Sequence, residues 1–481
     1  MRTFRSIRRA AWVVLPLLAL VGCSRSEAPD PPGRVLVVGI DGASWRMLDP
    51  LFERGALPHL ARLRAAGASG RLESLIPIQS PRIWNSIATG KTPEKHGIVA
   101  FAKRVGRRDL RLYLGHDRKT HALWNIVSDA GLEVAVVNWW NTFPPEAIDG
   151  VMISDHIQPS EIEEREELAH ASDTPVGALA HPARWQARLH ELLADDTPPI
   201  AFEDPFADVD SIPFSAWTGE RLARSFHDDA AVLRLALTVE AEERPDVMLV
   251  FFPGIDRVSH FLWGMIEPPE RYPENLRTTE AERAAGRRAF ERYYAWTDAM
   301  IGALLERFGP DDLVVVLSDH GFEAGHELGF LTGVHKTEEA LDGVLFVRGP
   351  GIPARVETGD VGVLDVTPSI LAWLGLPVGE DMDGRVAPFF PDERVERVAT
   401  HDTTPIVWLE TAASGSDARI LENLRALGYL EDEGGGVARD GEADEDAAAE
   451  EDGDAAEDGD GDAAEGGDGD AAEDGDGATR R

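Results

Sequence analysis

Three runs of consecutive apolar residues stand out along the chain and predict strands that are buried on both faces. They are RVLVVGIDG at 34–42, DVMLVFFPGID at 246–256 and DLVVVLSDHGF at 312–322. Uninterrupted apolar runs are typical of parallel strands that helices cover on both sides. Each run ends at or next to an acidic residue, and the carboxyl ends of parallel strands meet at one edge of a sheet. We therefore expect a shared polar site at that edge.

Helical periodicity alternates with strand patterns through most of the chain. Shorter strands are predicted at 132–140, 151–155 and 343–352. The predicted helices cover 56–70, 81–90, 121–131, 218–245, 287–309, 365–376 and 418–430. Strands that alternate with helices indicate parallel βαβ units. The predicted fold class is therefore α/β, with a mostly parallel central sheet and helices on both of its faces.

The alternation breaks down between 158 and 210, where the sequence is polar, irregular and contains proline. We interpret about 156–215 as a cap inserted above the carboxyl edge of the sheet, where the loops of α/β folds set specificity. Its aromatic residues Trp185, Phe202 and Phe206 either line a pocket or pack the cap itself. We expect this cap to decide which substrate is accepted.

The negative charge of the chain is concentrated at its C-terminal end. The formal net charge is −39, and residues 431–481 carry 22 Asp and Glu against 3 Arg. This segment repeats Gly-Asp-Ala-Ala-Glu with a period of eight and has almost no apolar side chains. We predict that it is a disordered tail behind a folded domain at 34–430. The domain itself is moderately acidic, which excludes nucleic-acid binding by a basic surface.

The first 23 residues have the pattern of a signal peptide. Four arginines among residues 2–9 precede a short apolar stretch that ends in Leu-Val-Gly and Cys23, the only cysteine of the chain. The pattern resembles a bacterial lipoprotein signal, which implies a lipid on Cys23; an ordinary secretory signal and a membrane anchor are the alternatives. Residues 24–33 would be a tether. Because Ser24 follows the cysteine, we expect a lipid-anchored protein of the bacterial cell envelope, on the outer membrane.

Ser80 stands just before the proline that opens the predicted helix at 81–90. Serine before proline is a strong helix-start signal, and the simplest interpretation makes Ser80 the N-cap. The alternative is a nucleophile, because a helix N-terminus offers N–H groups and a positive dipole end to an alkoxide or a phosphate. A serine needs activation for that role. No base lies nearby in the sequence, so a base or a metal must come from elsewhere in the chain.

Acidic and histidine residues follow the three buried strands in a pattern typical of metal ligands. The candidates are Asp41, Asp256, His260, Asp319, His320 and His335. His260 comes four residues after Asp256, so one face of a helix would present both side chains to a cation. His326 is the alternative to His335. Aspartate and histidine without cysteine favour zinc or manganese over an iron–sulfur cluster.

Together these motifs resemble the alkaline phosphatase superfamily, and most closely its type I phosphodiesterase/nucleotide pyrophosphatase branch. The motifs are GIDG, S-P-x-x-W-x-x-I-A-T-G-K-x-P-x-x-H-G-I, G-x-D-x-x-x-H, SDHGF, G-x-H and GPGI, spread over 34–385. The resemblance implies two metal ions, usually zinc, and assigns the nucleophile to Ser80. It further implies two ligand sets, one of Asp41, Ser80, Asp319 and His320, and the other of Asp256, His260 and His335.

The chain departs from the family pattern at two points. Nucleotide pyrophosphatases carry an Asn shortly after H-G-I that contacts a phosphoryl oxygen, whereas residues 99–101 here are Val-Ala-Phe. Four nearby cations could replace that contact, although a solvated surface position is the simpler interpretation of each: Lys91, Lys95, Lys103 and Arg104. Sulfatases of the superfamily use C/S-x-P-x-R, and the spacing of Ser-Pro-Arg at 80–82 differs from it.

These observations predict an exported phosphoester hydrolase that uses two divalent ions, Zn²⁺ or Mn²⁺, and a phospho-serine intermediate. Its substrate would be a small phosphoester or a component of the envelope. The alternatives are a transferase that moves a phospho-group between envelope molecules, a sulfatase-like hydrolase, and a binding protein without turnover. The complete ligand set argues against the last of these. The sequence leaves the identity of the substrate and the oligomeric state open.

Overall fold

The computed structural model describes residues 31–105, 110–157, 177–195, 197–207, 216–326, 331–391 and 395–409, with 421, 424–425, 430 and 437–439. The predicted signal peptide and most of the tether lie outside these ranges, as does the acidic repeat segment. Within the described ranges, no helix is both long and apolar enough to cross a membrane.

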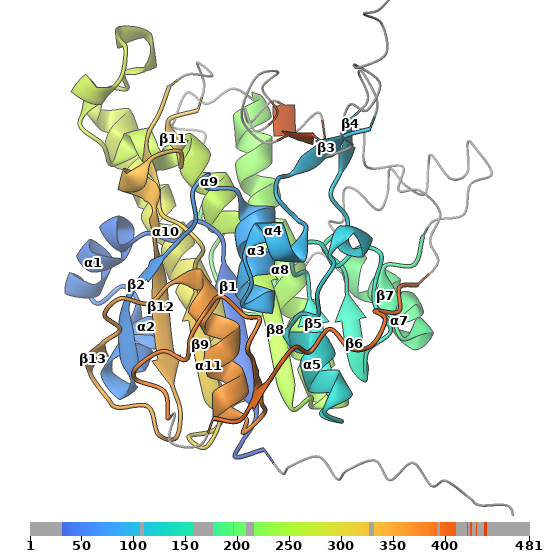
Figure 1. Ribbon diagram of the computed structural model, residues 1–481. Helices are drawn as coiled ribbons and strands as arrows, with labels where there is room; N and C mark the ends of the chain where they lie inside the picture. Colours follow the sequence, from blue (N-terminus) through green and yellow to red (C-terminus); the bar gives the residue numbers. More distant parts are fainter. Residues whose placement is uncertain are drawn as a thin grey trace, which may run out of the picture. The chain divides into compact units, whose positions relative to one another are not determined.

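Among the described residues, a nine-stranded sheet forms the centre of the fold, in the order β13-β2-β12-β9-β1-β8-β5-β6-β7 (Figure 1). Its strands are β1 (Val35–Ile40), β2 (Ala68–Glu73), β5 (Val134–Val137), β6 (Gly150–Ile153), β7 (Ala180–His181), β8 (Val247–Phe252), β9 (Leu313–Leu317), β12 (Asp342–Arg348) and β13 (Val356–Glu357). The run from β9 to β6 is parallel throughout, whereas β12 and β7 are antiparallel to their neighbours in that run. The predicted mostly parallel α/β sheet is therefore confirmed.

Helices cover both faces of this sheet because successive residues of a strand point to opposite sides. On β1, Leu36 and Val38 enter one hydrophobic core, and Val35 and Val37 enter the other. The first core is covered by α1 (Trp45–Glu53), α2 (Pro58–Ala66), α7 (Ala183–Leu193), α8 (Ala216–Glu243), α9 (Gly254–Leu262) and α10 (Glu280–Leu305). The second core is covered by α3 (Ser80–Thr89), α5 (Leu123–Asp129) and α11 (Val366–Trp373). The short helix α4 (Pro93–His96) follows α3.

Three small sheets accompany the central one in the described part of the chain. They are β10 (Glu323–Ala324) with β11 (Gly333–Val334), β14 (Val378–Gly379) with β15 (Arg397–Val398), and β3 (Ala102–Arg104) between β4 (Leu110–Leu112) and β16 (Val437–Arg439). β16 belongs to the segment that the sequence predicted as a tail, and it pairs in parallel with β3. Leu421, Leu424 and Leu430 pack in one cluster with residues of β3 and β4. The described strand pairing therefore extends beyond residue 430, the predicted end of the domain.

Part of the segment predicted as a cap instead belongs to the body of the domain. β7 adds an antiparallel strand to the edge of the central sheet, and Trp185 of α7 is buried in the first core. The rings of Phe202 and Phe206 pack against aromatic rings of α10 at centroid distances of 5.3 and 5.5 Å. Trp185 and Phe206 are thus buried in the first core, and Phe202 packs partly buried against it, so all three contribute to the body of the domain. Residues 158–176, 196 and 208–215 of the segment lie outside the described ranges.

Candidate metal centre

The three strand ends that carry candidate ligands lie side by side, because β9, β1 and β8 are neighbours in the sheet. Asp41 directly follows β1, and Asp319 and His320 follow β9. Asp256 and His260 lie four residues apart on α9, which begins just after β8, as the sequence predicted. The parallel arrangement thus delivers the side chains to the carboxyl edge of the sheet.

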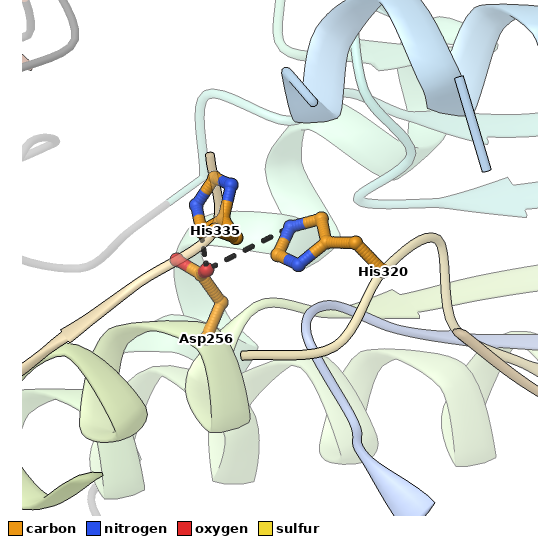
Figure 2. Close-up of side chains that lie close together, drawn as sticks. All are labelled: Asp256, His320 and His335. Atoms are coloured by element: carbon orange, nitrogen blue, oxygen red, sulfur yellow. Dashed lines mark ion pairs between the residues drawn. The ribbon is translucent and has the colours of Figure 1, made fainter. Parts of the chain in front are cut away.

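The candidate side chains form two overlapping groups whose ligand atoms lie within 4.8 Å of one another. One group is Asp41, Asp319 and His320, and the other is Asp256, His320 and His335. In the first, His320 Nε2 is 3.5 Å from both Asp41 Oδ1 and Asp319 Oδ2. In the second, Asp256 Oδ1 is 3.5 Å from His335 Nε2 and 3.9 Å from His320 Nε2, and Figure 2 shows the two imidazoles directed toward the same carboxylate.

The remaining candidates lie at the border of these groups or away from them. His260 Nε2 is 3.6 Å from Asp256 Oδ1, so it adjoins the second group. His320 reaches into both groups, whereas the sequence assigned it to the Asp41 set alone. His326, the alternative to His335, is exposed. The structure thus brings together every side chain of the predicted ligand set.

Backbone carbonyls orient two of the histidines toward the carboxylates. His260 Nδ1 is 2.9 Å from the carbonyl oxygen of Gly333, and His320 Nδ1 is 2.8 Å from that of Gly321. Each Nδ1–H therefore donates to a carbonyl, which directs Nε2 of the ring toward the carboxylates of the cluster. This is the usual support of a metal-binding histidine.

The electrostatics of the cluster fit a bound divalent cation. Burial and the neighbouring carboxylate of Asp41 raise the pKa of both Asp256 and Asp319 well above the usual range. Burial lowers the pKa of His260 to about 4, so its imidazole is neutral, as a metal ligand must be. Within the cluster, Asp256 Oδ1, Asp319 Oδ2 and His320 Nε2 are buried and have no hydrogen-bond partner among the described residues. Packed carboxylates and unpartnered ligand atoms of this kind could hold a divalent cation.

Ser80 is the first residue of α3, and Gln79 occupies the N-cap position without a side-chain capping bond. The interpretation of Ser80 as the N-cap is therefore wrong. Its buried hydroxyl instead donates a hydrogen bond to Asp41 Oδ1 at 3.3 Å. The serine that the motif pointed to thus lies at the edge of the acidic cluster, at the positive end of a helix dipole.

The cations that follow Ser80 are engaged elsewhere. Lys91 is buried, contrary to the solvated position expected for it, and donates to Asp381 Oδ2 at 2.6 Å and Asp402 Oδ2 at 2.7 Å. Lys95 pairs with Asp383. Lys103 lies 3.4 Å from a carboxylate oxygen of Asp117, and Arg104 lies half-buried on β3. A local sequence window could not show these pairings, because the partners of Lys91 and Lys95 lie far along the chain.

Two residues that the sequence analysis did not single out hold the strand ends together. Ser318 Oγ bonds to the carbonyl oxygens of Ala43 at 2.7 Å and His320 at 3.0 Å, which ties the turns after β1 and β9 to each other. Gly42 has a φ of +69°, and a Cβ there would lie 2.6 Å from the ring of Phe322. Both residues stand next to candidate ligands within the GIDG and SDHGF motifs. Their place in these motifs is the sequence signal from which a role at the site could have been predicted.

Residues 35–399 match the sequence profile described as type I phosphodiesterase/nucleotide pyrophosphatase. No curated protein matches the chain. Human ectonucleotide pyrophosphatase/phosphodiesterase 5 is 12% identical with a TM-score of 0.42, covering 73% of this chain and 97% of that one. A putative sulfatase from Bacteroides thetaiotaomicron is 13% identical (TM-score 0.48; 77% and 76% covered). A phosphonate monoester hydrolase from Silicibacter pomeroyi is 18% identical (TM-score 0.44; 75% and 78% covered).

Proposed function

The chain belongs to the type I phosphodiesterase/nucleotide pyrophosphatase family, and from this premise we propose that it is a metal-dependent phosphoester hydrolase whose nucleophile is Ser80. The observation that carries the proposal is the convergence of Ser80 with buried carboxylates and imidazoles that come from distant parts of the chain. A structural role alone would not require so many buried ionisable groups in one place, because each is costly to bury.

The chain's own residues would act on the phosphoester in a defined order. Asp41 accepts the hydroxyl hydrogen bond of Ser80 and so holds Oγ at the edge of the cluster. Attack of Oγ on phosphorus would form a phospho-serine and expel the leaving alcohol. The N-terminal end of α3 favours the alkoxide and the phosphoryl oxygens. Water would then release phosphate, or the phosphate monoester from a diester, and regenerate Ser80.

Two divalent cations would be held by the predicted ligands, with Asp41, Ser80, Asp319 and His320 on one side and Asp256, His260 and His335 on the other. When bound, such ions lower the pKa of an attacking hydroxyl and neutralise charge on the leaving oxygen. The Nε2 atoms of His260 and His320, which face the carboxylates of the cluster, support this assignment.

We also propose that the protein is exported and anchored through lipidated Cys23, and that its substrate is a small phosphoester or an envelope component. The support is the pattern of residues 1–23 and the position of the only cysteine. Growth in labelled palmitate, followed by isolation of the wild-type chain and Cys23→Ala, tests the anchor. Equal labelling of the two proteins would contradict it.

The decisive experiment for the enzyme is an activity screen of the protein beginning at Ser24. Substrates would be aryl phosphomonoesters, phosphodiesters, phosphonate esters and sulfate esters, each with Zn²⁺ or Mn²⁺ supplied. We expect cleavage of at least one phosphorus ester. Cleavage of sulfate esters alone would favour the sulfatase-like alternative, and an added alcohol that captures the phosphoryl group more efficiently than water would favour a transferase. No turnover of any ester would contradict the proposal.

A further inference from the structure

The segment between His320 and His335 carries one ligand at each end. Its described parts form a hairpin in which Glu323 pairs with Val334 and Ala324 with Gly333. Residues 327–330 between the two strands lie outside the described ranges. A ladder of two residues on each strand is marginal on its own. The strand before His335 is also held to α9, because Thr332 N–H donates to the carbonyl oxygen of His260 at 2.8 Å and His260 Nδ1 lies 2.9 Å from that of Gly333. The backbone after His335 needs an anchor of its own.

Glu323 supplies that anchor immediately beyond His335. Its Oε1 accepts hydrogen bonds from the backbone N–H groups of Lys336 at 2.8 Å and Thr337 at 2.7 Å. Its Oε2 accepts a third bond, from Thr337 Oγ1 at 2.6 Å. The Glu323 residue is 6% exposed, so these bonds are shielded from water. Charge-assisted bonds to backbone N–H groups are among the stronger ones in proteins.

The ring of His335 is held by contacts of its own with neighbouring aromatic rings. It stacks on the ring of His320 at a centroid distance of 3.9 Å and meets the edge of Phe322 at 5.4 Å. These contacts set the plane of the imidazole but not the path of the chain. A metal ligand must be held to within about 0.5 Å of its productive position. Of the contacts described here, only the Glu323 bonds hold the backbone directly after His335.

We propose that Glu323 is a positioning residue that sets the place of His335 in the cluster and thereby the affinity of the Asp256–His260–His335 side for its cation. This inference rests on the proposed function, because it concerns how one of the two cations is held. Glu323 itself lies outside the ligand set. It acts through the two residues that follow His335.

The test is calorimetric titration of the metal-stripped protein with Zn²⁺ alone, beside metal content measured by mass spectrometry. The wild type should bind two ions. Glu323→Ala should bind one ion as tightly as the wild type and the second at least about tenfold more weakly, the effect expected from losing an outer partner of a ligand. Glu323→Gln should keep most of the affinity, because its amide oxygen can still accept from both N–H groups and Thr337 Oγ1 can turn to accept from the amide nitrogen.

Glu338→Ala is the matched control, because Glu338 is an exposed glutamate of the same turn. It should bind both ions like the wild type. Should Glu323→Ala not fold, Glu323→Asp retains the charge but is one methylene shorter, and the same loss is expected. Unchanged binding of both ions by the folded Glu323 variants would overturn the inference and leave the proposed function standing. A wild-type protein that bound fewer than two ions would instead overturn the proposed function, and this inference with it.

Discussion

Asp229 should lower the free energy of unfolding at neutral and alkaline pH, and Asp229→Asn should restore it. This aspartate of α8 is fully buried and accepts a hydrogen bond from Tyr293 Oη at 2.9 Å. Its Oδ1 has no hydrogen-bond partner among the described residues. Burial is the main cause that raises the pKa of Asp229 from 3.8 to about 7, and the neighbouring Asp228 contributes to the rise.

The sign of the effect on stability follows from comparing the protonation of Asp229 in the folded and unfolded states. Below pH 3.8 both states carry the proton, so Asp229 has no effect. As pH rises, the unfolded chain releases the proton first, and stability falls until the folded state titrates near pH 7. The interval of about 3 pH units corresponds to a loss of stability of about 4 kcal/mol at pH 8 and about 2 kcal/mol at pH 5. Asparagine is neutral throughout and its amide oxygen can still accept the Tyr293 bond.

The assay is the melting temperature of wild type and Asp229→Asn at pH 5 and pH 8. For the roughly 350 residues that the structure describes, the unfolding entropy is ~0.7 kcal/mol per kelvin. The variant should therefore melt about 2–3 °C above the wild type at pH 5 and about 6 °C above it at pH 8. Asp311→Asn, an exposed site, should show no such pH-dependent gain. A gain that did not grow with pH, or a variant less stable than the wild type at pH 8, would refute the reasoning.

Three further changes test other parts of the structure. Ser80→Ala should lower kcat at least about 10³-fold while the melting temperature stays within a few degrees; near-normal turnover would remove Ser80 from the mechanism. Removal of metal by a chelator should abolish activity, and Zn²⁺ or Mn²⁺ should restore it; full activity of protein shown to be metal-free would contradict the metal assignment. Lys91→Met should cost about 2–3 kcal/mol in a denaturant titration, because it strands Asp381 and Asp402, whose side chains are only 31% and 27% exposed; an unchanged unfolding midpoint would show that this buried triad is not stabilising.

The sequence could predict those residues of the site that local patterns within one strand or one helix mark. The buried runs of β1, β8 and β9 each lead directly into an acid, and the four-residue spacing of Asp256 and His260 suits the first turns of α9. These features need only local patterns and the rule that parallel strands share an edge.

What sequence could not show depends on partners far along the chain. Lys91 looked like a surface cation because its two aspartates are separated from it by most of the domain. Phe202 and Phe206 looked like residues of a cap because the helix on which their rings pack, α10, lies much further along the chain. The hydroxyl of Ser80 bonds to Asp41 and not to its own helix, which no helix-start rule predicts.

The central position of β1 has a consequence for how the chain is made. β1 ends at Ile40, yet its two neighbours begin only at Val247 and Leu313. β1 is therefore synthesised early but cannot pair with either neighbour until most of the domain has been made. Contacts of such long sequence separation form slowly, and partly made chains expose unpaired strand edges to aggregation. The cluster of Asp256, His320 and His335 is complete only once His335 has been synthesised. A chain that stops before His335 therefore lacks one of its side chains, however well the earlier strands have formed.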